Sequence, residues 1–136
     1  MNLLVPAWNR LDPLHERGRA WLVERVADEE PLGVSELAVS GALRVLTMPG
    51  VRRLSHDQGA VLELVDELLA APGVVRLRAG VRHWGIFREL CRTTGATGNQ
   101  VPNCHHAALA VEHGATWASR DRFFADVPGL TWTSPY

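Results

Sequence analysis

Short apolar segments alternate with amphipathic helical segments along most of this chain, and this alternation limits the fold more than any other feature. Helical periodicity marks a first surface helix over Leu14–Asp28, whose polar face is rich in arginine and glutamate. A short apolar strand at 32–35 and a helix over about 36–47 follow it. Strands that alternate with helices predict an α/β sandwich with a mainly parallel sheet.

The same alternation continues through the second half of the chain. Ser55 and Gln58 form a capping-box pattern at the start of a helix that Pro72-Gly73 ends. The other expected elements are a strand at 74–77, helices over about 80–93 and 102–113, and strands at 115–118 and 130–133. A chain of 136 residues suffices for one core, so we expect a single domain over residues 1–136.

The tryptophans are expected to belong to the core. Most of the five lie on apolar stripes of predicted helices or in predicted strands. In the helix over about 80–93, the apolar stripe consists of Trp84, Phe87 and Leu90. Core packing is the usual role of such large aromatic side chains.

The start of the chain departs from this pattern. A doubly wound fold opens with a hydrophobic strand, whereas here only Asn2-Leu3-Leu4-Val5 precedes Pro6. These four residues could equally begin a helix. We therefore expect the first strand of the sheet to be missing or truncated.

Composition excludes several classes of protein. With 46% hydrophobic and 21% charged residues, the chain is globular rather than disordered. No apolar run approaches the roughly 20 residues that a membrane span needs. The 14 basic residues are all arginine and the net charge is −1, which argues against a strongly basic coat but allows a local basic cleft. Two cysteines are too few for a disulfide framework, which favours a cytoplasmic protein.

Polar residues stand at three places where a parallel sheet would position active groups. Glu36 directly follows the strand at 32–35, Asp121 follows the strand at 115–118, and Asn103 opens the helix before that strand. Converging carboxylates suit hard divalent cations, which can activate water for attack on a phosphodiester. The alternative is structural, because a single acid near a helix start more often caps the helix or lies in a solvated turn.

The histidines raise the question of a zinc site. Cys104, His105, His106 and His113 are suitable ligand types. Adjacent residues on a helix point about 100° apart, however, so the first three cannot all face one ion. Helical geometry therefore disfavours zinc. A glycine-rich phosphate-binding loop is also absent from the sequence.

The second half of the chain carries short motifs in a recognisable order. They are LLAAPGVV at 68–75, RHW at 82–84, GN at 98–99, VPNCHHAALA at 101–110 and ATWASRDRFF at 115–124. In the first half, GALRVLT at 41–47 is similar to the "GFLRxxT" helix of one VapC subgroup. The chain thus resembles PIN-domain proteins of the VapC toxin type over nearly its whole length.

The resemblance implies a PIN-like three-layer sandwich and an endoribonuclease that depends on Mg²⁺ or Mn²⁺. It also implies a cytoplasmic toxin of a toxin–antitoxin pair, which acts on RNA, is held inactive by a small VapB-like antitoxin and is usually a homodimer. Four acids form the family's site, and the first ends the first strand. Asn2 corresponds to the Asn two places after that acid, so the acid and its strand would lie before the first residue.

The other family positions are matched only in part. Glu36 stands at the second acid position, near the start of the helix after the second strand. Asn103 stands where the "DAHLAALA" helix has its Asp, and His106 replaces a leucine of that motif. Asp121 matches the first Asp of the "SxDxDF" turn, while Phe123 replaces the second. The resemblance therefore implies a catalytic set of Glu36, Asn103 and Asp121, with the two acids as metal ligands.

These departures imply a weakened or inactive nuclease, because an amide at Asn103 keeps the shape of a carboxylate but removes a charge beside the ion. Three explanations compete: a start that lies upstream, an engineered or natural silencing change, and a decayed toxin that still folds and binds its antitoxin. The alternative function is a catalytically dead PIN-like interaction protein that binds an antitoxin or dimerises.

Three arginines are candidates for contacts with the RNA backbone, because guanidinium forks match phosphate oxygens. They are Arg44, Arg120 and Arg122. The alternative is that each is solvated or pairs with a nearby acid, and for Arg44 the two interpretations have equal weight.

Overall fold

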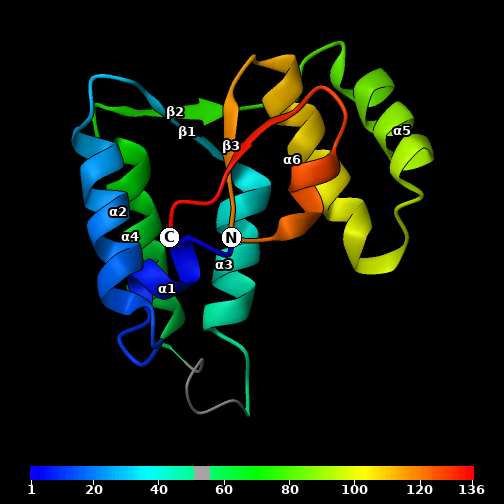
Figure 1. The fold of residues 1–136 in the computed structure, drawn as a ribbon. Helices are drawn as coiled ribbons and strands as arrows, with labels where there is room; N and C mark the ends of the chain where they lie inside the picture. The colour runs from blue at the N-terminus through cyan, green and yellow to red at the C-terminus, as the bar shows by residue number, and fades with distance from the viewer. Residues whose placement is uncertain (51–55) are drawn as a thin grey trace. The chain divides into compact units, whose positions relative to one another are not determined.

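The computed structural model describes residues 1–50 and 56–136, which form two compact units, Met1–Arg76 and Leu77–Tyr136. Both units contain helices and strands (Figure 1). In the first unit, β1 and β2 form a two-stranded sheet. The elements described there are α1 (Leu4–Trp8), α2 (His15–Ala27), β1 (Leu32–Ser35), α3 (Glu36–Leu46), α4 (Gln58–Ala70) and β2 (Val74–Leu77), whose last residue is the first of the second unit.

The second unit contains a parallel strand pair. Strands β3 and β4 pair in register, with Trp117 opposite Trp132. The predicted combination of helices with parallel strands is therefore confirmed. The elements of this unit are α5 (His83–Thr94), the 3-10 helix η1 (Gly98–Gln100), α6 (Val101–Glu112), β3 (Thr116–Ala118), the 3-10 helix η2 (Arg122–Asp126) and β4 (Thr131–Thr133).

The first element is a helix, which decides between the two structures considered for residues 2–5. The backbone N–H groups of Leu4 and Val5 both donate to the carbonyl oxygen of Met1, at 3.1 Å each. Pro6 is tolerated because it lies in the first turn, where a backbone N–H has no partner within the helix. In the described part of the chain no strand precedes α1.

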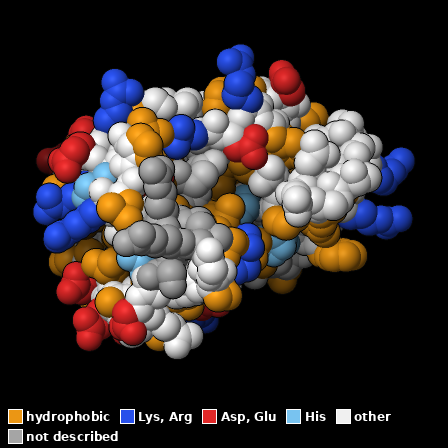
Figure 2. Space-filling model, turned by 90° about the horizontal axis from the view of Figure 1, so that it is seen from below, with side chains coloured by type: hydrophobic (Ala, Val, Ile, Leu, Met, Phe, Trp, Pro, Cys, Tyr) orange, Lys and Arg blue, Asp and Glu red, His pale blue; other side chains and the backbone are white. Residues whose placement is uncertain are grey.

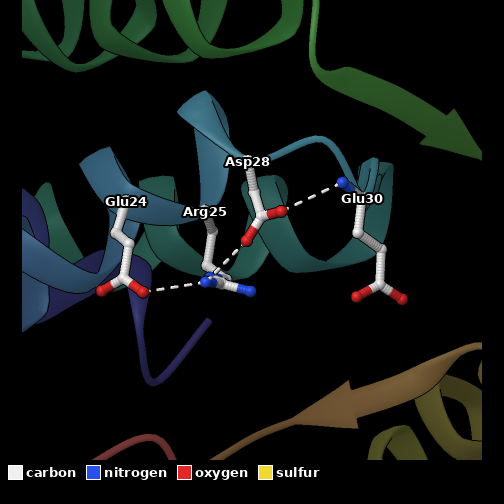
Figure 3. A network of polar contacts seen from close by, with 4 residues as sticks. All are labelled: Glu24, Arg25, Asp28 and Glu30. Carbon is white, nitrogen blue, oxygen red and sulfur yellow. Dashed lines mark hydrogen bonds and ion pairs between the residues drawn. The ribbon is translucent and has the colours of Figure 1, made fainter.

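Helix α2 ends at the acidic run, as its sequence predicts. The Asp28 carboxylate accepts a 3.1 Å hydrogen bond from the Glu30 backbone N–H (Figure 3). It also forms an ion pair with the Arg25 guanidinium, at 2.7 Å. Arg25 also contacts Glu24 at 2.9 Å. The Glu30 N–H and the Arg25 charge hold the pKa of the Asp28 carboxyl below its usual value. This local network turns the chain from α2 toward β1.

The start of α4 differs from the capping box that the sequence predicts. Ser55 lies outside the described residues. The N-cap is Asp57, whose carboxylate accepts a 3.0 Å hydrogen bond from the Ala60 backbone N–H. Asp57 is one of the residue types that best satisfy a helix N-terminus, and it lies two positions after Ser55, the N-cap that the box would require.

Each unit has its own hydrophobic core. In the first unit, residues from all four helices and β1 pack together: Leu4, Ala7, Leu22, Val34, Val39, Ala42, Val65 and Leu68. In the second unit, the core is formed by residues of α5, α6 and the segment after β3: Leu90, Cys104, Ala107, Ala108, Phe124 and Val127. Among the described helices, none combines the length and the apolarity needed to cross a bilayer.

One tryptophan is not in a core, contrary to the expectation from its helical stripe. Trp84 is 69% exposed. Helix α5 packs against α6 through His83, Phe87 and Leu90, which are spaced i, i+4, i+7. Trp84 follows His83 by one residue, or about 100° around the helix, and this rotation turns it to solvent. The other four tryptophans are half-buried.

Candidate functional site

Two of the predicted site residues are in direct contact. The Asn103 side chain, in the first turn of α6, donates a hydrogen bond from Nδ2 to Oδ2 of Asp121, at 3.0 Å. Asp121 lies in the turn between β3 and η2. The contact joins residues 18 positions apart in the second unit. Two of the three predicted site residues thus lie side by side within the second unit.

The turn that carries Asp121 is anchored to the parallel strands. Ser119 is buried, its backbone N–H donates to Thr133 O at 3.0 Å, and the Trp132 indole N–H donates to Ser119 O at 2.9 Å. The Ser119 hydroxyl oxygen then accepts from the Asp121 backbone N–H at 3.1 Å. The sequence motif did not assign these roles to Ser119 and Trp132. The Ser-x-Asp spacing at 119–121 is typical of a turn in which the serine hydroxyl bonds the backbone two residues later, and it could have predicted the role of Ser119.

Asp121 has a structural role besides its place in the site. It is the N-cap of η2, and its Oδ1 accepts a 2.9 Å hydrogen bond from the Phe123 backbone N–H. Both carboxylate oxygens therefore have a donor. Asp121 therefore has the helix-capping role that is the structural alternative to a catalytic one. Phe123, where the family motif has a second acid, packs against the core of the second unit.

Asn103 is held in place by the way α6 begins. The 3-10 helix η1 opens with a capping box between Thr97 and Gln100 and leads directly into α6. Pro102 occupies the first turn, where its missing N–H has no cost. Cys104, the next residue, is fully buried. The half-buried Asn103 side chain is thereby fixed at the positive end of the α6 dipole.

Glu36 belongs to the first unit, where it begins α3 immediately after β1. The structural alternative for this residue was helix capping, but the cap is Ser35, whose hydroxyl oxygen accepts from the Ala38 backbone N–H at 3.1 Å. The Glu36 side chain is exposed and lies in the first turn, where the helix dipole favours a negative charge. Its role as a metal ligand stays a prediction.

The Asn103–Asp121 pair, as arranged, does not fit a divalent cation. An amide N–H cannot coordinate a metal, and here it is directed at the carboxylate oxygen that a metal would need. Over residues 1–50 and 56–136, no three His, Cys, Asp or Glu side chains gather as ligands. The pair is a neutral donor bonded to a charged acceptor.

The three arginines predicted to bind RNA lie on exposed surfaces. Arg120 and Arg122 flank Asp121, and the Arg120 guanidinium carbon lies 5.6 Å from the centre of the Tyr136 ring. Arg44 is in the last turn of α3, in the first unit. Arginine at that end of a helix is favoured by the dipole, which gives Arg44 a structural role as well.

The histidines of α6 point in different directions, in agreement with the argument against zinc. The His106 ring stacks on Trp117 at 4.9 Å, whereas the His105 ring lies on the side of α6 that faces α5. His113 donates from Nε2 to Arg78 O at 2.8 Å. Burial lowers the pKa of His106 to about 4, so this ring is neutral at physiological pH.

Comparisons with known proteins agree with this fold and motif pattern. The PIN domain family model matches residues 2–130. Among solved structures, the crystal structure of VapBC2 from Rickettsia felis bound to a DNA fragment from their promoter is similar, with a TM-score of 0.65 and 14% identity. The match covers 97% of this chain and 92% of that one. The predicted PIN-like fold is therefore confirmed.

Sequence comparison gives closer relatives. This chain is 41% identical over 136 residues to the VapC ribonuclease Mb2897 of Mycobacterium bovis and to ribonuclease VapC43 of Mycobacterium tuberculosis. Each alignment covers 99% of this chain and 92% of the relative. Ribonuclease VapC37 of Mycobacterium tuberculosis is 30% identical, with 98% and 93% covered. The chain belongs to the VapC ribonucleases of the PIN-domain family.

Proposed function

We propose that this protein is the toxin of a VapBC-type toxin–antitoxin pair, a metal-dependent endoribonuclease whose activity is weakened or absent in the sequence as it stands. Membership of the VapC family supports the reaction type, which is hydrolysis of RNA phosphodiesters. The observation that supports a loss of activity is the hydrogen bond from the Asn103 amide to the Asp121 carboxylate. We place the protein in the cytoplasm.

In this proposal, Glu36 and Asp121 are the metal ligands and Asn103 occupies a third catalytic position. The ion is Mg²⁺ or Mn²⁺, because carboxylate oxygens are the ligands that these hard cations prefer. When bound, such an ion supplies an activated water and stabilises the leaving oxygen. Arg44, Arg120 and Arg122 are the candidates for holding RNA phosphates.

Charge explains why an amide at Asn103 reduces activity. A divalent ion near the RNA phosphate needs several negative ligands, and the amide contributes none. The amide also donates its N–H to Oδ2 of Asp121, so metal binding must first break that hydrogen bond. Replacing Asn103 with aspartate removes the donor and adds a charge at the same position, with almost no change in shape.

RNA cleavage tests this proposal. Purified wild-type and Asn103→Asp proteins are incubated with labelled single-stranded RNA while MgCl₂ or MnCl₂ is titrated. We expect cleavage by the variant at metal concentrations where the wild type is inactive or much slower. Asn99→Asp is the matched control, because Asn99 is exposed in η1 and undergoes the same chemical change. Adding Asp121→Asn to the active variant is expected to abolish cleavage.

The missing charge at Asn103 also favours a second function, that of a catalytically dead interaction protein. Such a protein keeps the PIN-like fold, binds a VapB-like antitoxin or forms a homodimer, and does not cut RNA. If Asn103→Asp does not cleave RNA with either metal while the wild type binds a co-expressed VapB-like antitoxin, this second function replaces the first. Light scattering of the purified chain measures whether it is a dimer.

We further propose that residues 1–136 fold as one domain. The family model spans most of both compact units, which supports this proposal. Thermal unfolding followed by circular dichroism and by tryptophan fluorescence is expected to give coincident single transitions. Two separate transitions would show that the units unfold independently.

A further inference from the structure

The beginning of α5 carries an exposed surface that the proposed catalytic site does not use. Val81, in the loop before the helix, and Trp84, in its first turn, are 101% and 69% exposed. Arg88 lies four residues after Trp84 and is also exposed. Residues spaced i, i+4 on a helix are neighbours. We call Val81, Trp84 and Arg88 the α5 surface.

The α5 surface lies in the most basic part of the second unit. Between residues 78 and 92 there are four arginines and one acid, Glu89. Arg92 pairs with Glu89 at 3.2 Å, while Arg88 has no ion pair with a described residue. Figure 2 shows arginine side chains projecting on the side of the view where α5 lies in Figure 1. The surface thus combines apolar area with positive charge.

The loop before α5 is fixed by Glu112, at the end of α6. The Glu112 carboxylate accepts hydrogen bonds from the backbone N–H groups of Gly80, at 2.8 Å, and Arg82, at 3.1 Å. The Arg82 guanidinium donates to Glu112 O at 2.8 Å. A Cβ at Gly80 would lie 2.5 Å from Glu112 Oε1, so any larger residue would require the Glu112 carboxylate to shift. Val81 and Trp84 are therefore presented on an ordered backbone.

The Trp84 ring is supported from within the protein. The Phe87 ring lies 5.6 Å from it, centre to centre, at an angle of 44°, and Phe87 itself packs against the core of the second unit. A large aromatic ring that is held on one side and exposed to water elsewhere provides a surface on which a nucleic-acid base can stack.

We propose that the α5 surface binds single-stranded RNA, with a base stacked on Trp84 and a phosphate held by Arg88. This inference rests on the proposed function, which makes RNA the substrate, and assigns part of the RNA-binding surface to residues outside the catalytic set. Single-stranded nucleic acid is recognised by aromatic rings that stack bases beside cations that hold phosphates. An acidic peptide would use the arginines but would leave the indole ring in water, so RNA fits this surface better.

Binding is measured with the wild-type chain, since cleavage is not required. A fluorescein-labelled single-stranded RNA of about ten nucleotides is titrated with protein at several salt concentrations, and the affinity is read from anisotropy. We expect Trp84→Ala to weaken binding about tenfold or more and Trp84→Phe to retain most of it. We expect Arg88→Ala to weaken binding and to make the salt dependence shallower by about 0.7 in log–log slope.

Matched controls separate a role of the α5 surface in RNA binding from the loss of any surface arginine and from misfolding. Arg19→Ala removes an exposed arginine from α2, in the other unit, and is expected to change binding little. The affinity for duplex RNA, whose bases are already stacked, is expected not to change in Trp84→Ala. Circular dichroism checks that each variant is folded.

Two results would overturn the inference: unchanged RNA affinity in folded Trp84→Ala, or loss of binding to a VapB-like antitoxin without loss of RNA binding. Failure of Asn103→Asp to cleave RNA concerns only the proposed function, because affinity at the α5 surface is measured without any cleavage.

Discussion

The Asn103 side-chain amide donates a 3.0 Å hydrogen bond to the Asp121 carboxylate, which joins the start of α6 to the turn after β3. In a site built for divalent cations, two carboxylates in these positions would repel each other until an ion neutralised them. The amide replaces that repulsion with an attraction. The pair is therefore stable without a metal, and the same contact accounts for the proposed loss of activity.

Asn103→Asp is expected to lower stability in the absence of metal and to restore it when metal is added. Without an ion, the variant loses one hydrogen bond and places two carboxylates side by side, which costs about 1–2 kcal/mol of unfolding free energy. A bound ion stabilises the folded state in proportion to the logarithm of its concentration. Urea unfolding with EDTA and with MnCl₂ measures both effects. Equal responses of the variant and the wild type to MnCl₂ would contradict this prediction.

Asp121→Ala is expected to lower the unfolding free energy by about 1 kcal/mol, because Asp121 is the N-cap of η2. The substitution also leaves the Asn103 amide without its acceptor. Chemical denaturation of the two proteins measures the difference. Asp126→Ala, at the other end of η2, serves as the control and is expected to have a smaller effect. A stability equal to the wild type would show that the cap contributes nothing.

His106 is expected to make the protein sensitive to acid. Its pKa is about 4 in the folded chain, lowered from 6.5 first of all by burial. Between these values the unfolded chain binds a proton that the folded chain does not, so stability falls as the pH falls from 6.5 to about 4. The full loss is about 3 kcal/mol.

His106→Leu tests this directly, because it places the family's leucine in the same buried position. We expect the variant to be more stable than the wild type at pH 5 and to show a weaker pH dependence between 4 and 6.5. His105→Leu, at the neighbouring half-buried ring, is the comparison. Parallel pH profiles of wild type and His106→Leu would exclude His106 as the source of the acid sensitivity.

Glu112→Gln is expected to loosen the loop before α5. The Gly80 N–H, with that of Arg82, holds the pKa of the Glu112 carboxyl below its usual 4.5. The Glu112 carboxylate therefore stabilises the folded chain fully above about pH 4.5, the ordinary pKa, and this stabilisation is lost as the pH falls through the lower pKa of the folded state. Amide hydrogen exchange at Gly80 and Arg82 is expected to be faster in the variant at neutral pH. Unchanged exchange would show that the loop is held by other contacts.

Local signals predicted most elements correctly, because helices and short strands depend on nearby residues. The acidic run that begins at Asp28 ends α2, and Pro102 opens α6, where the sequence indicates. The prediction that Trp84 lies in the core was wrong, because the apolar stripe of α5 can be drawn through residue 84 or residue 83. Only the packing of α5 against α6 decides between them, and it buries His83.

The sequence by itself determined the order of most elements, the family and the residue at each predicted site position, since these depend on local pattern and motif spacing. The tertiary structure decided what Asn103 and Asp121 do. Their hydrogen bond joins residues 18 positions apart and depends on the anchoring of Ser119 to the parallel strands. It also decided that Ser35, not Glu36, caps α3. Contacts between segments distant in sequence form only when the chain packs, so no local pattern specifies them.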